Sequence, residues 1–413
     1  MKKKKQNIFE AAMSVFGKKS NGDWYQDNFS DAYFKTYFQN TDKAVWTPRN
    51  YEKFAEEGYA KNVVAYRSIN LIAQAVSSVG LKVFKEDKNG QIEVLNHDIL
   101  KLLKRPNPCC SGKEFLESII IYRMINGNSF VMAVAPDNVT PRELHVLRPD
   151  RVSIIAGKGG LPSAYQYNTG ERVQNVPVDR ISGGSKMLHI KNFNPSNDWY
   201  GMSPIEAAAY SIDQHNQAGV WNQALLQNGA KPSGALVVKV NGDGSGGTLS
   251  EEQFSRIKNQ VDEQYSGAAN AGRPILLEGG LDWKEMSLSP KDMDFIESKN
   301  SSARDIALAF GVPPQLLGIS GDNSYSNLIE ARVALWEQTV LPLLDNVINS
   351  LNNWLAPMYK GEGLTIAYDT DSISALSHRR EKVWKRIQEA EFMTVNEKRA
   401  AVGLSSVEGG DGI

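Results

Sequence analysis

The sequence contains very little cysteine, and its charges almost cancel. Of its 413 residues only Cys109 and Cys110 are cysteines, and they are adjacent. Neighbouring cysteines rarely bridge each other and do not form a zinc site alone, so we expect reduced thiols in an intracellular setting. The formal net charge of -1 lacks the basic excess of a protein that grips duplex DNA. This argues against tight nucleic-acid binding, but not against DNA that passes nearby.

Sequence motifs of the common enzyme classes are also missing. Residues Gly183–Lys186 lack the spacing of a phosphate-binding loop, and neither an H-E-x-x-H nor a G-x-S-x-G pattern occurs. No apolar run is long enough to cross a membrane. The histidines are few and scattered: His97, His145, His189, His215 and His378. We therefore predict no catalytic residue, no cofactor and no metal, and we interpret Met1–Lys5 as a solvated basic tail.

Two acidic groups are the remaining candidates for metal chemistry. Asp292, Asp294 and Glu297 lie close together, as do Asp369 and Asp371. Carboxylate pairs hold Mg²⁺ in many nucleases. Acids also suit a helix N-terminus because of the helix dipole, and they are common at strand ends. We favour this structural interpretation, and a metal-dependent nuclease remains the weaker alternative.

The first part of the chain indicates a mixed α+β domain. Residues 1–50 are predicted to form a flexible arm. Helices are expected over 61–79, 97–104 and 111–126, the last with a capping box between Ser111 and Glu114. Short strands are expected at 81–85, 129–135, 144–147, 152–155, 164–167 and 187–190.

A long polar helix and a small module follow. Ser203, Pro204 and Glu206 form a strong helix start, and the helix is expected to run unbroken to Asn228. Its middle is too polar for one apolar core, so we expect it to be exposed or packed on other helices. The small module is predicted from strands at 235–240, 274–277 and 281–288 and a helix capped by Ser250 and Gln253.

The last third is a helical hairpin with a polar tip. A helix over 294–309 should end at Gly311, because Pro313 and Pro314 forbid its continuation. A longer helix is predicted from Asn327, capped with Glu330, to Leu355, with a kink at Pro342. A strand at 364–368, a helix over 377–390, a capping box between Thr394 and Glu397 and a frayed tail at 408–412 complete the chain.

Several of these segments, in this order, resemble the portal proteins of long-tailed phages, prophages and gene transfer agents. The resemblance spans about 62–403 and is carried by Gly201–Ala208 (GMSPIEAA), Leu226–Gly234 (LQNGAKPSG), Pro290–Phe295 (PKDMDF), Ile306–Gly318 (IALAFGVPPQLLG) and Thr339–Leu343 (TVLPL). It implies a helix-rich α+β portal fold and a dodecameric ring at one capsid vertex. Double-stranded DNA would pass through the ring during packaging and ejection.

The resemblance also implies a division of the chain and a set of partners. The parts are the arm (1–50), an α+β wing (51–200), stem helix 1 (201–229), a small α/β clip (230–289), stem helix 2 (290–311), a tunnel loop (312–326), a kinked long helix with a returning wing strand (327–376), and a small helical crown with the C-terminal tail (377–413). The implied partners are other copies of the chain, the large terminase subunit, a head–tail adaptor and the major capsid or scaffolding protein. The implied location is the virion, after assembly in the host cytoplasm, with no membrane contact.

Site residues follow from this division as hypotheses. We expect the channel to be lined by Asp292, Asp294, Glu297, Gly318, Asp322, Asn323, Ser324 and Tyr325. A non-adhesive lining suits a conduit, because every phosphate contact adds affinity and would stall the duplex. We expect the stem or subunit interface to include Asp213, His215, Asn216 and Trp221. The structural alternative is a capsid or head–tail adaptor protein without its own channel.

Overall fold

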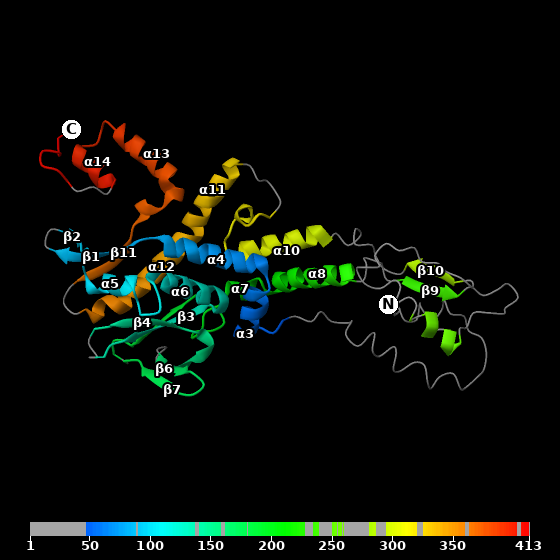
Figure 1. The fold of residues 1–413 in the computed structure, drawn as a ribbon. Coiled ribbons are helices and arrows are strands. Elements are labelled where there is room, and N and C mark those ends of the chain that lie inside the picture. Colours follow the sequence, from blue (N-terminus) through cyan, green and yellow to red (C-terminus); the bar gives the residue numbers. More distant parts are fainter. Residues whose placement is uncertain are drawn as a thin grey trace, which may run out of the picture. The chain divides into compact units, whose positions relative to one another are not determined.

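The computed structural model describes most of the chain from Thr47 onward, and all described residues lie in the unit Thr47–Ile413. The described residues are 47–87, 90–136, 140–157, 162–179, 181–227, 234–238, 250–253, 255–257, 259, 281–285, 295–319, 325–359, 363–402 and 406–412. Residues 1–46 of the arm, the loop residues 320–324 and most of the small module therefore lie outside the described residues. Figure 1 shows the elements in chain order.

Two packed helices form the centre of the main core. Helix α4 (Val63–Ser78) begins where the Asn62 side chain accepts hydrogen bonds from the Val64 and Ala65 amides. Helix α6 (Gly112–Asn126) starts with the predicted capping box and ends at Gly127, whose φ of 80° needs a residue without a side chain. The helices pack against each other through their apolar faces. Both predicted helices are thus confirmed within two residues at their ends.

The strands form small antiparallel sheets. Their bounds are β1 Leu81–Asp87, β2 Gly90–Glu93, β3 Asn128–Val134, β4 Glu143–Leu147, β5 Val152–Ala156, β6 Pro162–Asn168, β7 Val173–Pro177, β8 Met187–Lys191, β9 Gly234–Val238, β10 Leu281–Glu285 and β11 Leu364–Tyr368. The sheet orders are β11-β1-β2, β4-β3-β8, β5-β6-β7 and β10-β9. Strands β2 and β7 were not predicted. The predicted strand at 274–277 lies outside the described residues.

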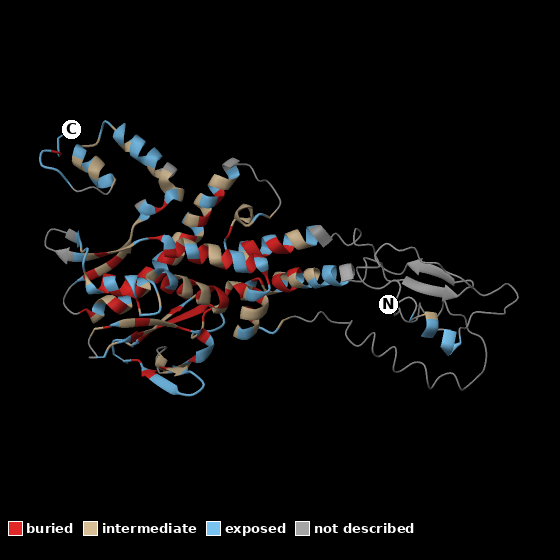
Figure 2. Cartoon of the chain, viewed as in Figure 1, coloured by how far each residue is buried: buried red, intermediate tan, exposed pale blue. Residues whose placement is uncertain are grey.

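Short helical turns connect these elements. They are α3 Tyr51–Lys53, the π-helix η1 Phe54–Ala60, α5 Asp98–Lys104, η2 Pro149–Arg151, η6 Ala356–Met358, η7 Thr370–Ser372 and η8 Ser374–Leu376. The π-helix was not predicted, because one extra residue in a helical turn leaves no clear mark on apolar spacing. Figure 2 shows that buried residues concentrate in α4, α6 and the strands beside them. A second, smaller core lies around Phe130 and Tyr165, between two of the small sheets.

The long polar helix is interrupted, which corrects the prediction of one helix from Ser203 to Asn228. Helix α7 (Pro204–Ala207) stops at Ala208, and α8 (Ala209–Gln227) continues the chain. The cause is tertiary. Ser203 caps α7 and also donates a hydrogen bond to the Met124 carbonyl of α6 (2.7 Å), while Ile205 is fully buried. These contacts set the direction of α7 independently of α8.

In the helical hairpin, the first helix ends where the sequence predicted, but the second helix begins earlier than predicted. Helix α10 (Phe295–Ala309) ends at Gly311, which has a φ of 67°. Helix α11 (Tyr325–Leu335) begins before Asn327, so the predicted capping box between Asn327 and Glu330 is wrong. Neither Tyr325 nor Ser326 opposes a helix strongly, so local preference leaves this start undetermined.

The break near Pro342 is a π-helical turn. This turn, η5 (Trp336–Val340), separates α11 from α12 (Leu341–Leu355), in which Pro342 is the second residue. Proline cannot donate the next hydrogen bond of a helix, and a widened turn relieves the lost bond. A kink was predicted at Pro342, and the structure places a π-helical turn just before this proline.

The C-terminal helices form a small unit whose tail is ordered. Helix α13 spans Ser377–Gln388, and α14 (Val395–Ala401) begins with the predicted capping box between Thr394 and Glu397. The prediction of a frayed tail is wrong. The Asn396 side chain donates to the Val407 carbonyl (3.0 Å) and accepts from the Val407 amide (2.8 Å), which holds the tail on α14.

Candidate functional site

Helices α8 and α10 lie side by side (Figure 1), and they carry five of the predicted site residues: Asp213, His215, Asn216 and Trp221 on α8 and Glu297 on α10. The buried apolar side chains of the pair are small or aliphatic: Ile212 on α8, and Ala303, Ile306 and Ala307 on α10. A hydrogen bond from Ser302 to Gln214 (3.5 Å) adds a polar link. The packing of α8 against α10 therefore fixes the positions of the exposed side chains on both helices.

Three of the predicted interface residues bind within the chain itself. Asp213 accepts hydrogen bonds from the Thr47 amide (2.9 Å) and the Thr47 hydroxyl (2.5 Å). His215 and Asn216 both contact the Asn62 side chain, at 3.3 Å and 3.0 Å. Burial, and next the positive charge of Lys299, lower the pKa of His215, which favours its neutral form.

The second half of α8 is exposed, in contrast to the first half. Figure 2 shows burial decreasing along the helix. Val220 is 59% exposed and Trp221 is 45% exposed, and Tyr210 near the start of the helix is 49% exposed. Apolar side chains of this size at one surface are typical of a site that another molecule covers. Of the predicted interface residues, Trp221 is the one whose side chain is exposed.

The acidic start of α10 is only partly described. Glu297 lies in the first turn of the helix and is exposed. Asp292 and Asp294 lie outside the described residues. Glu297 is followed on the same helix by Lys299, Arg304 and Asp305, so the described part of α10 carries charges of both signs.

The loop after α10 folds back onto the body over its described part. Val312 is 2% exposed, and the 3-10 turn η4 (Pro314–Leu317) places Leu316 and Leu317 against the main core. Gly318 ends this turn, is exposed, and has a φ of 72°. Asp322, Asn323 and Ser324 lie outside the described residues. Tyr325 is the first residue of α11, and its side chain is also outside them.

A buried polar connection near α6 was not found from the sequence. Arg123 is 6% exposed, and its Nε donates to the Asn192 side chain (2.6 Å). Burial lowers the pKa of Arg123 to about 10. The Asn128 side chain accepts from the Gly201 amide (2.7 Å), close to the start of α7. These amides link β3 and the end of β8 to the segment that leads into α7, and isolated Asn residues in a sequence do not reveal such links.

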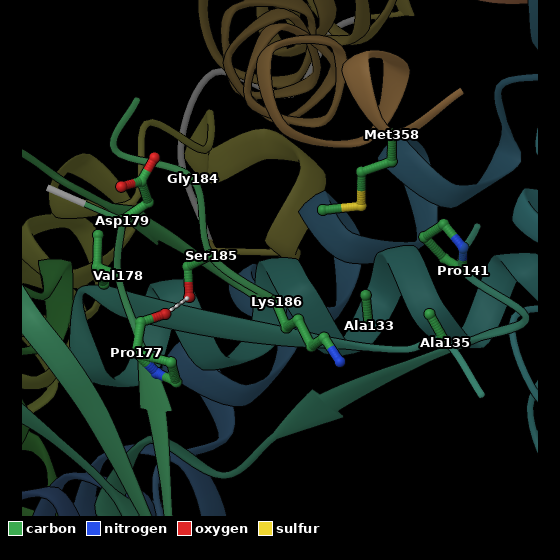
Figure 3. A pocket seen from close by; sticks show the side chains of 10 residues that line it. All are labelled: Ala133, Ala135, Pro141, Pro177, Val178, Asp179, Gly184, Ser185, Lys186 and Met358. Atoms are coloured by element: carbon green, nitrogen blue, oxygen red, sulfur yellow. Dashed lines mark hydrogen bonds between the residues drawn. The ribbon is translucent and has the colours of Figure 1, made fainter. Parts of the chain in front are cut away.

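A hollow of about 450 Å³ lies between the small sheets and η6 (Figure 3). Its floor is largely apolar, with Pro141, Pro177 and Met358 among the lining residues. Asp179 and Lys186 point in different directions in Figure 3, and the Asp179 carboxylate accepts from the Ile181 and Ser182 amides. This arrangement is a turn rather than a catalytic pair.

Metal-binding groups are likewise lacking in the part of the chain that the structure covers. No cluster of three or more His, Cys, Asp or Glu side chains occurs among the described residues. Asp369, one of the nuclease candidates, pairs with Lys82 (3.2 Å). Within those same residues no helix is both long and apolar enough to cross a bilayer.

The comparisons with known proteins decide the family. Residues 63–403 match the family described as "Phage portal protein". The chain belongs to the phage portal protein family. The portal protein of Enterobacteria phage HK97 is 24% identical over 84% of this chain and 79% of its own length. A protein of Rickettsia bellii, described as "Uncharacterized protein", is 48% identical over 86% of this chain and 90% of its own length.

Solved structures agree with the portal assignment. The chain resembles the protein in "Neck of empty GTA particle computed with C6 symmetry", with 42% identity, a TM-score of 0.68, and coverage of 89% of this chain and 96% of that one. A phage portal protein from Corynebacterium diphtheriae has a TM-score of 0.54 at 15% identity, covering 79% of this chain and 96% of that one, which shows a shared fold. The helix-rich α+β portal fold predicted from the sequence is confirmed.

Proposed function

We propose that this chain assembles into a dodecameric ring that forms the portal of a phage or gene transfer agent particle. The observation that carries the proposal is the similarity to proteins solved in the necks of such particles. One of these, at 42% identity, is described as "Neck of native GTA particle computed with C12 symmetry". The ring would be the passage for double-stranded DNA during packaging and ejection.

The exposed half of α8 supports a subunit interface in this ring. Val220 and Trp221 are large apolar side chains on a helix that projects beyond its own buried contacts. We place Trp221 at the contact with a neighbouring subunit, since tryptophan is enriched at the centres of interfaces. Asp213, His215 and Asn216 contribute to that interface by holding α8 in position, through the bonds to Thr47 and Asn62.

The charge distribution supports a channel that does not hold DNA tightly. The formal net charge is -1, and Glu297 is an exposed acid in the first turn of α10. We place Asp292, Asp294 and Glu297 on the channel wall. We also place the loop residues Gly318, Asp322, Asn323, Ser324 and Tyr325 beside the channel; Gly318 is exposed, whereas Leu316, Leu317 and Ile319 pack on the core.

The remaining parts and partners follow the division made from the sequence. We propose the wing, stem, clip, tunnel loop and crown within the bounds given above, with the clip end as the contact for the large terminase subunit and the head–tail adaptor. The chain would supply structure and a passage, while terminase supplies the energy of ATP. The assembled ring would lie at one vertex of the virion, after assembly in the host cytoplasm.

Electron microscopy of the purified chain tests the proposal. We expect rings with a central hole wide enough for duplex DNA. Replacement of Trp221 by Ala should reduce the fraction of rings while leaving the subunit folded, because the side chain is half-exposed. The matched control is Ile181→Ala, which removes an apolar side chain that is 97% exposed and far from α8 in the sequence. A chain that remains monomeric at every concentration, and in the presence of capsid or scaffolding protein, would overturn the proposal.

A further inference from the structure

Helix α13 is exposed on every side. All six side chains from Glu381 to Arg386 are exposed, and they span more than one turn of about 3.6 residues. Val383 is 39% exposed and Trp384 is 50% exposed. Figure 2 shows the contrast with α4 and α6, whose inner faces are buried. Most of the stability of a short helix comes from packing of its apolar face. The exposed Val383 and Trp384 of α13 are therefore candidates for contact with another molecule.

An apolar groove of about 280 Å³ lies between α13 and α14. Its lining residues are Trp384, Ile387, Gln388, Val395, Lys398, Arg399 and Val402. The lining thus combines aliphatic and indole groups with two basic side chains, Lys398 and Arg399, and the Lys398 ammonium donates to the Gln388 carbonyl at 3.4 Å. The groove therefore fits an apolar side chain that has an acid beside it.

A side chain of this kind projects from the same unit. Phe392, in the loop between α13 and α14, is 80% exposed, and the adjacent Glu391 is exposed as well. The capping box places this loop firmly at the start of α14: the Thr394 amide donates to Glu397 (2.8 Å), and the Glu397 amide donates to the Thr394 hydroxyl (3.2 Å). Phe392 thus has a defined position, and it lies outside the groove of its own chain.

A projection and a matching groove on one unit can link identical copies head to tail. Such heterologous contacts close into a ring when the rotation between copies closes. Charge favours the same pairing, since Glu391 would approach Lys398 and Arg399. Duplex DNA would bind the basic residues of α13 through its phosphates. It would not bind an exposed phenylalanine beside an acid, so a second copy of the chain is the better partner.

We propose that, in the ring, Phe392 of each subunit inserts into the groove between Trp384 and Val395 of the next subunit, with Glu391 beside Lys398 and Arg399. This contact rests on the ring assembly proposed above. It would connect the C-terminal units of all subunits in a closed ring of contacts, in addition to the contact at Trp221. The exposed faces of α13 would be covered in part by the neighbouring copy.

Photo-crosslinking from position 392 tests this contact directly. Phe392→p-benzoylphenylalanine keeps an aromatic side chain at the exposed position, so the chain should fold and assemble. Irradiated rings should give dimers and higher multiples on a denaturing gel, with the crosslinked peptide lying within 384–402. The same probe as Val407→p-benzoylphenylalanine is the control, because Val407 is 41% exposed on the same unit but does not line the groove. It should give no crosslink to this peptide.

A second variant measures the strength of the contact. Phe392→Ala should raise the apparent dissociation constant between subunits by about tenfold, as expected for loss of a buried aromatic anchor. Val407→Ala should leave it unchanged. Circular dichroism of both variants would verify that the subunits remain folded.

The outcomes separate this contact from the portal proposal itself. Rings seen by microscopy that give no intersubunit crosslink from position 392, and that assemble normally as Phe392→Ala, would overturn the contact and leave the portal proposal standing. Adducts that nuclease removes from DNA-filled particles would assign the groove to DNA, which also overturns it. Absence of rings in the unmodified chain would instead remove the portal proposal on which the contact rests.

Discussion

The carboxylate of Asp213 on α8 holds Thr47 through both of its oxygens, across 166 residues of sequence. Thr47 is the first residue of the unit Thr47–Ile413, so this bond fixes the start of that unit. The same stretch of α8 holds Asn62, the cap of α4, through His215 and Asn216. The middle of α8 is too polar to lie in an apolar core. Its role is to bind Thr47 at the start of this unit and Asn62 at the start of α4.

Loss of the Asp213 carboxylate should destabilise the subunit. We expect Asp213→Ala to lower the free energy of unfolding by about 1–3 kcal/mol, because two hydrogen bonds disappear and the Thr47 groups lose their partner. Urea denaturation of the monomeric chain measures this. Thr47→Ala is the control, since it removes only the hydroxyl bond and should cost less. Equal stability of Asp213→Ala and the unmodified chain would show that the bond does not anchor the fold.

Two glycines should respond oppositely to the same change. A Cβ on Gly201 would lie 2.2 Å from the Gly127 carbonyl oxygen, so Gly201→Ala forces the backbone apart and should cost about 2–3 kcal/mol. A Cβ on Gly219 of α8 meets nothing within 4 Å. Gly219→Ala should therefore stabilise the subunit by about 0.5–1 kcal/mol, because alanine loses less backbone conformational entropy than glycine when the helix forms. Thermal unfolding of both variants distinguishes them, and a neutral Gly201→Ala would contradict the close approach.

Acid should weaken the subunit through His189. Its ring stacks on Phe130 at 4.4 Å and contacts the Asn128 side chain at 3.0 Å. Burial, and next the charge of Lys191, lower the pKa of His189 to about 3. Between the unfolded pKa of about 6.5 and this value, the unfolded chain binds more protons, so stability falls as the pH falls.

The variant His189→Gln isolates this effect. The glutamine amide can still donate to Asn128 but does not titrate. Melting temperatures from pH 7 to pH 4 should fall less steeply in the variant than in the unmodified chain. His145→Gln is the matched control for replacing an imidazole by an amide, at a half-exposed ring that contacts Glu143. Identical slopes in His189→Gln and the unmodified chain would exclude His189 as the source.

Reversal of charge at Glu297 should make the channel hold DNA. In a ring, Glu297→Lys adds a positive side chain from every subunit, and each phosphate contact that results should steepen the logarithmic dependence of affinity on salt by about 0.9. DNA binding to purified rings between 50 and 200 mM salt, values chosen around the physiological range, would measure it. Glu297→Gln should change binding much less. If DNA binding and DNA packaging are the same in all three proteins, Glu297 does not line the channel.

Local signals predicted many element ends correctly. The capping boxes at Ser111 and Thr394 and the left-handed glycine at Gly311 are present as expected. The described helical residues of the small module also show the expected cap, with hydrogen bonds between Ser250 and Gln253. These features depend on atoms within a few residues of each other, so the sequence contains all the information needed.

Other features depend on contacts between distant segments. Strand β1 pairs with β11, and Leu81 lies opposite Tyr368, although neither strand signals its partner. The stop at Ala208 arises because Ser203 and Ile205 bind α6 and the core, and alanine itself favours a helix. The bonds of Asp213 to Thr47 and of His215 to Asn62 could not be predicted either, because a polar helix side looks the same whether it binds a neighbour or its own chain.

The sequence by itself determined the class of this protein, the order of its segments and the ends of most helices, because caps, glycines, prolines and family motifs act locally or in linear order. The tertiary structure decided which face of α8 is used within the chain, where the long helix breaks and which apolar side chains stay uncovered. The physical reason is that burial is a property of the packed chain: Trp221 and Phe392 are as apolar as Ile306, and only the fold shows that Ile306 is buried and the other two are exposed.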